Sequence, residues 1–140
     1  MMVVVDTSVW SLALRRKVSD LTASEPRLIQ ILYQLVDEGR VQLLGSVRQE
    51  LLSGLREEAQ FRRLRNYLRD FPDIPLATDD YEEAARASNE CRQAGIASSP
   101  VDMLICAVAL RRGWQIFSTD RDFARYRRAL PIQILLHVVE

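Results

Sequence analysis

Four carboxylates stand where a parallel β-sheet would gather them. Asp6 directly follows a run of valines, Glu50 lies in the first turns after a second apolar run, and Asp102 opens an apolar helical stretch. Asp120 follows a third apolar run. Because the ligand crevice of an open α/β sheet forms at the carboxyl ends of its strands, we expect these four side chains to share one crevice.

Such a cluster of carboxylates requires protons or a cation. Two carboxylates about 5 Å apart repel by roughly 3 kcal/mol at an effective dielectric constant near 20, and four repel more strongly. Oxygen ligands without a neighbouring imidazole or thiolate favour Mg²⁺ or Mn²⁺ over zinc. A divalent ion with coordination positions left for water and a phosphate oxygen suits the hydrolysis of a phosphodiester.

The other catalytic groups in the sequence are few. His137 is the only histidine, so neither a two-histidine site nor a Ser-His-Asp triad is expected. Cys91 and Cys106 are isolated in the sequence and form no zinc-binding pattern. The acidic cluster is therefore the main candidate for chemistry.

Helix capping is the alternative explanation for these acids. Asp6, Asp102 and Asp120 each lie near an expected helix start, where a carboxylate can accept free N–H groups. Glu50 could equally belong to a solvated helix face, although its apolar neighbours suggest partial burial. Capping can explain each acid taken singly, but it explains the four together less well. Serine caps a helix as readily as aspartate, and the chain places serines at other expected helix starts, namely Ser24, Ser46 and Ser99.

The apolar patterns predict the elements that position the acids. Runs typical of buried strands are Met2–Val5, Val41–Leu44, Trp114–Phe117 and Ile132–Leu136, with a possible fragment at Ile74–Leu76. Helical periodicity separates them. The expected helices are Leu28–Val36 between Ser24 and Gly39, a helix with a Ser46/Gln49 capping box, Phe61–Phe71, Asp79–Gln93, Ser99–Leu110 before Gly113, and Asp120–Arg128. Trp10, Leu12 and Leu14 alternate in a short segment of no assigned type.

Strands that alternate with helices indicate an α/β fold with a mostly parallel, helix-covered sheet. The 140 residues suit a single domain, 1–140. The start of the chain lacks the features of a signal peptide, and no apolar run is long enough to span a bilayer. We therefore expect a soluble, cytoplasmic protein with no membrane contact.

The basic residues are nearly all arginine. Lys17 is the only lysine among 19 basic residues, which balance 19 acidic ones, so a polyanion would have to bind a local patch. Arg121, Arg125 and Arg128 share one face of the last expected helix near Asp120 and could track an RNA backbone. A second set could do the same or form a solvated face: Arg62, Arg63, Arg65 and Arg69.

Four stretches, in this order along essentially the whole chain, resemble the PIN-domain ribonucleases, and most of all the VapC-like toxins of toxin–antitoxin pairs. They are Val3-Val4-Val5-Asp6-Thr7-Ser8-Val9-Trp10, Ser46-x-x-x-Glu50-Leu51, Asp102-x-x-x-x-Ala107 and Ser118-Thr119-Asp120-Arg121-Asp122-Phe123. The resemblance implies a PIN-like three-layer α/β/α fold with four or five mostly parallel strands. It also implies an Mg²⁺- or Mn²⁺-dependent endoribonuclease, a homodimer, and inhibition by a cognate VapB-like antitoxin.

The resemblance also assigns roles to residues. Asp6, Glu50, Asp102 and Asp120 match the acidic quartet of the family. Asp6 and Asp102 would be the principal metal ligands, while Glu50 and Asp120 would complete the shell, directly or through water. Asp122 remains an alternative to Asp120, a cap for the last helix, or a support for a second ion. The hydroxyls that would bind a carboxylate or a phosphate are those of Thr7, Ser8, Ser118 and Thr119; capping explains the first two equally well.

Other functions fit less well. A haloacid-dehalogenase-like phosphatase needs a second aspartate two residues after the first, where this chain has Ser8. A phospho-accepting receiver domain needs a lysine after a late strand, and Lys17 comes far too early. A housekeeping RNA-processing nuclease and a non-catalytic PIN binding module remain as alternatives, the latter disfavoured by the intact acidic quartet.

Overall fold

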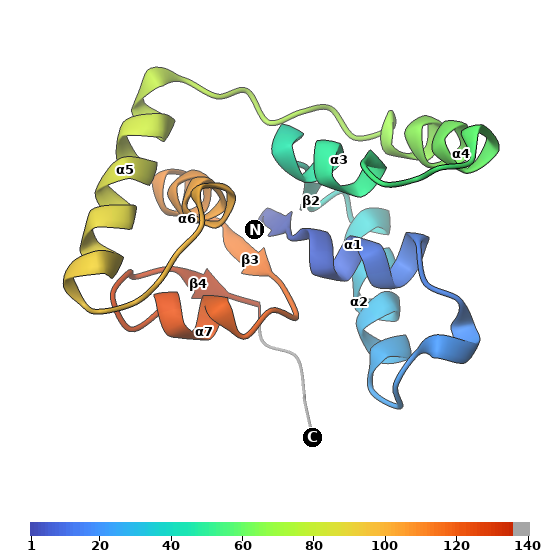
Figure 1. The fold of residues 1–140 in the computed structure, drawn as a ribbon, viewed down its shortest axis with the longest axis horizontal. Helices are drawn as coiled ribbons and strands as arrows, with labels where there is room; N and C mark the ends of the chain where they lie inside the picture. The colour runs from blue at the N-terminus through green and yellow to red at the C-terminus, as the bar shows by residue number, and fades with distance from the viewer. Residues whose placement is uncertain (136–140) are drawn as a thin grey trace.

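Four short parallel strands form the centre of the molecule. The structure is a computed structural model that describes residues 1–135. The strands are β1 (Val3–Val5), β2 (Val41–Gln42), β3 (Gln115–Phe117) and β4 (Gln133–Ile134). Their order in the sheet is β2-β1-β3-β4, and every pairing is parallel, as the alternation of strands and helices predicted (Figure 1).

Helices provide all the crossover connections between these strands. They are α1 (Thr7–Leu14), α2 (Glu25–Asp37), α3 (Gly45–Leu52), α4 (Glu58–Leu68), α5 (Thr78–Gln93), α6 (Pro100–Arg112) and α7 (Asp122–Tyr126), with a 3₁₀ turn at Val18–Asp20. In Figure 1, α1 to α4 gather beside β1 and β2, and α5 to α7 gather beside β3 and β4. Within residues 1–135, no helix is long and apolar enough to cross a lipid bilayer.

The hydrophobic core surrounds β1 and α6. All three valines of β1 are fully buried, since the strand lies between β2 and β3 with helices packed over it. Helix α6 is apolar nearly all round and packs against α5, β1 and β3. Gly113 ends α6 in the left-handed conformation with φ of 69°, which a side chain would disfavour. This arrangement fixes Asp6 and Asp102 on rigid supports.

The expected serine caps are only partly confirmed. The Ser99 hydroxyl accepts the Asp102 N–H at 3.1 Å and caps α6 as predicted. Ser24 precedes α2 as predicted, but its side chain makes no capping bond. The Ser46 capping box is wrong, because α3 starts at Gly45 with Leu44 as its N-cap, and the buried Ser46 hydroxyl has no hydrogen-bond partner among the described residues. Burial of the apolar residues at its start fixes this helix instead.

The strands are shorter than their apolar runs. The fragment Ile74–Leu76 forms no strand: the chain pairs there only through an isolated bridge between Leu43 and Asp73. Pro72 and Pro75 flank this point and have no N–H to extend the ladder. The last predicted strand, 132–136, is confirmed at Gln133–Ile134, and its final residue, 136, lies outside the described residues.

Residues 7–14 form a helix that the alternating apolar pattern did not indicate. Helix α1 buries Val9, Trp10 and Leu12 on one broad face, because 3.6 residues per turn place these three within about 160° of the helix circumference. Trp10 belongs to the core, with its ring edge-on to Phe71 at 5.2 Å between centroids. A segment of eight residues is too short for its apolar pattern to distinguish a helix from a strand.

A buried carboxylate ties the start of α5 to the end of α6. Asp80 has no exposed surface and accepts hydrogen bonds from Arg111 at 2.7 Å and from Arg112 at 2.7 and 3.1 Å. It also accepts the Ala77 N–H at 2.9 Å. The Arg112 guanidinium is the main cause that holds the pKa of Asp80 well below its usual range. Asp80 therefore remains charged at neutral pH and clamps the two helices together.

We predict that Asp80→Asn lowers the free energy of unfolding at pH 7 by about 3 kcal/mol, because it leaves two half-buried arginines without their shared charge. A carboxylate whose pKa is lowered by folding stabilises the protein above its unfolded pKa, and that contribution disappears as the pH falls. Denaturant titrations should therefore show the difference between the variant and the wild type shrinking below about pH 4. Asp79→Asn is the control, since Asp79 is exposed and, within the described chain, forms an ion pair with Arg111 alone, at 3.5 Å. An equal loss in both variants would contradict the clamp.

Candidate active site

Most of the predicted site residues line one cleft. The cleft has a volume of about 360 Å³ and lies where β1 and β3 end. Among its lining residues are all four acids of the predicted quartet and three of the predicted hydroxyl residues: Asp6, Glu50, Asp102, Asp120, Thr7, Ser8 and Thr119. Residues more than 100 positions apart are thus brought together, as the topology of a parallel sheet predicted.

Asp6 is held by two serine hydroxyls. It is buried, and its Oδ2 accepts hydrogen bonds from Ser118 at 2.8 Å and Ser8 at 3.0 Å. Ser8 also accepts the backbone N–H of Thr119 at 3.0 Å, which links the segments after β1 and β3. Asp6 occupies the N-cap position of α1 but makes no side-chain capping bond. The capping explanation therefore fails for Asp6. Its carboxylate is positioned by two serines that the sequence analysis had selected as carboxylate or phosphate partners.

Glu50 reaches the cleft from α3. The Thr7 hydroxyl donates a hydrogen bond to Glu50 Oε1 at 3.1 Å. Glu50 is exposed, so the partial burial inferred from its apolar neighbours is wrong: Leu51 turns into the core while Glu50 faces the cleft. Arg48 on the same helix bonds Asp73 at 2.8 Å and the carbonyl of Leu68 at 3.0 Å, which fixes α3 against the segment after α4.

Asp102 stands in the first turn of α6 without acting as its cap. Ser99 provides the cap, so the Asp102 carboxylate is free to interact elsewhere. The Tyr126 hydroxyl, from the end of α7, donates to Asp102 Oδ2 at 2.6 Å. Tyr126 is almost fully buried and packs edge-on against Phe123. This tyrosine was missed by the sequence analysis, although it lies four residues after Asp122 and so on the same helical face.

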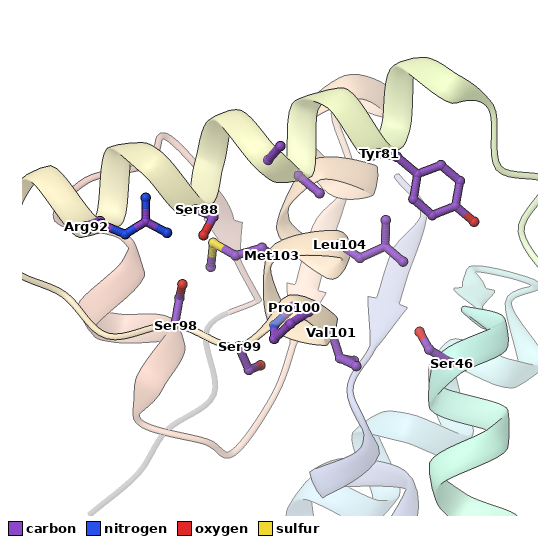
Figure 2. A pocket seen from close by; sticks show the side chains of 12 residues that line it. Ser46, Tyr81, Ser88, Arg92, Ser98, Ser99, Pro100, Val101, Met103 and Leu104 are labelled. Carbon is purple, nitrogen blue, oxygen red and sulfur yellow. The ribbon is translucent and has the colours of Figure 1, made fainter.

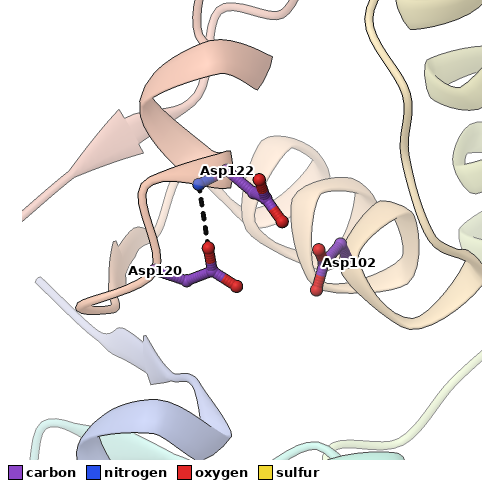
Figure 3. Close-up of side chains that lie close together, drawn as sticks. All are labelled: Asp102, Asp120 and Asp122. Atoms are coloured by element: carbon purple, nitrogen blue, oxygen red, sulfur yellow. Dashed lines mark hydrogen bonds between the residues drawn. The ribbon is translucent and has the colours of Figure 1, made fainter.

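Asp120 and Asp122 extend the acidic cluster toward Asp102. Each of the three carboxylates offers an oxygen, and these oxygens lie within 4.8 Å of one another. Figure 3 shows Asp102 on α6 facing Asp120, which follows β3, and Asp122, which begins α7. Asp120 Oδ1 accepts the Asp122 N–H at 2.9 Å, so Asp120 satisfies one free N–H at the start of α7, whose N-cap residue is Arg121. This bond occupies one Asp120 oxygen, and the other accepts no hydrogen bond from residues 1–135.

Burial and like charge make the centre of this cluster unfavourable for an isolated anion. Loss of solvent raises the pKa of Asp102, and the negative charges of Asp6 and Asp120 raise it further, against a lowering by the Tyr126 hydrogen bond. Burial and the Asp102 hydrogen bond raise the pKa of Tyr126 as well, so its hydroxyl stays protonated and donates. A cation beside Asp102 would relieve this repulsion.

The donors in this cluster suit a hard divalent cation. Asp102, Asp120 and Asp122 supply carboxylate oxygens only. Cys106 lies one turn after Asp102, but burial raises the pKa of its thiol, so no thiolate is offered. His137, the only histidine, lies outside the described residues. The oxygen set fits Mg²⁺ or Mn²⁺ better than zinc. The predicted ligands Asp6, Asp102 and Asp120 all line the cleft, but the oxygens within 4.8 Å of one another belong to Asp102, Asp120 and Asp122 rather than to Asp6.

The predicted RNA-contacting arginines lie outside this cleft. Arg121, Arg125 and Arg128 are exposed, but none is among the cleft-lining residues of the described chain. Arg125 forms an ion pair with Asp122. Helix α7 is also shorter than expected, ending at Tyr126 rather than Arg128, because the chain turns there toward β4. Cleft residues that the sequence analysis did not select are Ser11, Leu12, Arg15, Arg16 and Glu25.

A larger cavity elsewhere carries no comparable chemistry. It has a volume of about 560 Å³ and lies between α5 and α6, with Ser46 of α3 at its side (Figure 2). Its lining is mostly apolar, with Val101, Met103 and Leu104 from α6, and includes no carboxylate among the described residues. The acidic cleft is therefore the better candidate for an active site.

Several solved structures have a fold similar to that of this chain. The structure of FitAcB from Neisseria gonorrhoeae is similar with a TM-score of 0.75 and 19% identity, covering 96% of this chain and 97% of that chain. VapBC2 from Rickettsia felis, bound to a DNA fragment from its promoter, gives a TM-score of 0.75, 15% identity and coverages of 96% and 98%. VapBC-5 from Mycobacterium tuberculosis, a member of the VapBC family of toxin–antitoxin systems, gives a TM-score of 0.66 and 20% identity, covering 96% of this chain and 98% of that chain.

The sequence itself decides the family. A search of curated proteins gave no match. Residues 3–129 match the family model described as PIN domain, which spans every carboxylate of the cleft. The chain therefore belongs to the PIN domain family.

Proposed function

We propose that this protein is an Mg²⁺- or Mn²⁺-dependent endoribonuclease that hydrolyses RNA phosphodiester bonds. The observation that carries the proposal is the meeting of Asp6, Glu50, Asp102 and Asp120 in one cleft at the carboxyl ends of β1 and β3. Membership of the PIN domain family supports it. A divalent ion bound there would polarise the phosphodiester and lower the pKa of an attacking water.

Each acid has a distinct part in the proposed reaction. Ser8 and Ser118 orient Asp6 through one oxygen and leave its other oxygen for the ion. Tyr126 does the same for Asp102. Glu50 is exposed and held by Thr7, which suits it to orient the attacking water and accept its proton. Asp120, and Asp122 beside it, complete the acidic shell.

We further propose that the protein is the toxin of a type II toxin–antitoxin pair, a cytoplasmic homodimer inhibited by a VapB-like antitoxin. The similarity of its fold to solved FitAcB and VapBC complexes, over 96% of the chain, supports this proposal. Co-expression with the product of a neighbouring small open reading frame, followed by co-purification and light scattering, tests both partners. A protein that stays monomeric and binds no such product would instead be a housekeeping RNA-processing nuclease.

Asp102→Asn should lower the rate of RNA cleavage by at least about 100-fold, because a ligand that supports several kcal/mol of transition-state stabilisation is lost. The same change should leave the melting temperature equal or higher, since it removes a charge that burial and Asp6 disfavour. Cleavage of a labelled RNA and thermal unfolding measure both effects. Asp37→Asn, at the exposed end of α2, is the control; unchanged cleavage by purified Asp102→Asn would refute the assignment.

Removal of divalent ions should abolish cleavage. Treatment with EDTA should stop the reaction, and excess Mn²⁺ or Mg²⁺ should restore it, because the cleft supplies carboxylates and no histidine from residues 1–135. The measurement is gel analysis of a labelled RNA before and after addition of the ions. Cleavage that persists in EDTA would indicate a different mechanism.

Tyr126→Phe should raise the Mn²⁺ concentration needed for half-maximal cleavage by roughly 10- to 100-fold, the usual effect of removing a partner that orients a metal ligand. Titration of Mn²⁺ in the cleavage assay measures this shift, and calorimetry measures the affinity directly. Tyr81→Phe removes a hydroxyl from an exposed residue of α5 and should have no effect. Equal Mn²⁺ dependence in both variants would contradict the role of Tyr126.

A further inference from the structure

Two arginines enter the acidic cleft from the end of α1. Arg15 and Arg16 follow α1 directly, are exposed, and line the cleft together with Asp6, Glu50 and Asp102. Neither guanidinium forms a hydrogen bond or an ion pair within residues 1–135, even though carboxylates line the same cleft. Both cations are therefore available to a ligand.

Arg15 also borders a second cavity, whose lining contains no acid among the described residues. This cavity has a volume of about 300 Å³ and lies against α4, with Arg63 and Tyr67 in its lining. Leu14, Leu55 and Leu64 give it an apolar floor. Arg63 is exposed and, in the described part of the chain, pairs with no acid. Because both cavities share Arg15, an unpaired series of cations, which we name the arginine path, leads out of the cleft: Arg16, Arg15 and Arg63.

The chemistry of the arginine path matches single-stranded RNA. Guanidinium groups bind phosphate oxygens through two parallel N–H donors. The arginine path offers two such groups in the acidic cleft and a third in the cavity that shares Arg15 with it. Tyr67 and the leucines beside Arg63 offer an aromatic and apolar surface to an unpaired base. The chain has a net charge of zero, so attraction for a polyanion must come from such a local series.

The competing surface on α7 is less suited to this role. Arg125 is already paired with Asp122, and neither Arg121 nor Arg128 borders the cleft as the structure describes it. A phosphodiester placed over the carboxylates would meet negative charge, and Arg15 and Arg16 in the same cleft would offset that repulsion.

We propose that single-stranded RNA leaves the acidic cleft along the arginine path, with Arg15 and Arg16 holding phosphates next to the scissile one and Arg63 holding a phosphate further along. This inference rests on the function proposed above, because the acids must act on RNA for the path to carry substrate. It moves the RNA contact from the predicted residues of α7 to the end of α1 and to α4.

The test is RNA binding measured apart from cleavage. Fluorescence anisotropy with a labelled single-stranded RNA oligonucleotide, in EDTA and low salt, compares the wild type with Arg15→Gln, Arg16→Gln and Arg63→Gln. Each substitution should weaken binding about 5- to 10-fold and reduce the slope of log Kd against log salt by about 0.7, because one phosphate contact is lost. The matched controls remove a positive charge outside both cavities: Lys17→Gln, next to Arg16 in the sequence, and Arg86→Gln, exposed on α5. Both variants should bind like the wild type.

The outcomes separate the path from the proposed function. If the arginine variants bind RNA as tightly as the two controls while the wild type cleaves RNA with Mn²⁺, the path is wrong and the nuclease assignment stands; the arginines then face solvent or a protein partner. If the wild type neither binds nor cleaves RNA, the proposed function fails and the path fails with it. Weakened binding in the arginine variants alone, with intact melting temperatures, supports the path.

Discussion

Like charges crowded into one small cleft are the constraint around which this molecule is organised. The site acids are stabilised by neutral hydroxyls: Asp6 by Ser118, Asp102 by Tyr126, and Glu50 by Thr7. A hydroxyl orients a carboxylate without cancelling its charge, so the cleft keeps a negative potential that a divalent ion can satisfy. Asp80 shows the opposite arrangement in the same protein, because two arginines neutralise it.

The sheet order makes this crowding possible. Strands β1 and β3 are adjacent at the centre of the sheet, so the segments that follow them bring Asp6 beside Ser118 and Asp120. Helix α6 packs on both strands and presents Asp102 from its first turn. The acids therefore stand on buried, rigid elements, while the arginines that border the cleft lie on exposed chain.

The parts of this structure that depend on apolar pattern and topology were predictable from the sequence. The parallel sheet, the burial of α6, and the shared cleft of Asp6, Glu50, Asp102 and Asp120 follow from such patterns. Features that depend on three-dimensional burial were not. Helix α1 has only eight residues, too few for the helical period of its apolar face to stand out, and α3 begins without the expected serine cap.

Side-chain partners were equally hidden. The bond from Tyr126 to Asp102 joins two helices, and the ion pair with Asp122 involves Arg125, one of the arginines predicted to contact RNA. The pattern Arg15-Arg16-Lys17 was visible as a charge run, but only the path of α1 shows that its first two members turn into the cleft.

The pairing of β1 with β3 has a consequence for synthesis on the ribosome. Ser118 and Asp6, which are bonded across the cleft, are separated by 112 positions. While β3 is still inside the ribosome, the nascent chain cannot pair it with β1 and cannot assemble the site, even if the earlier helices have already formed. A prematurely terminated translation product that ends before β3 therefore lacks both Ser118 and Asp120 and cannot complete the cleft.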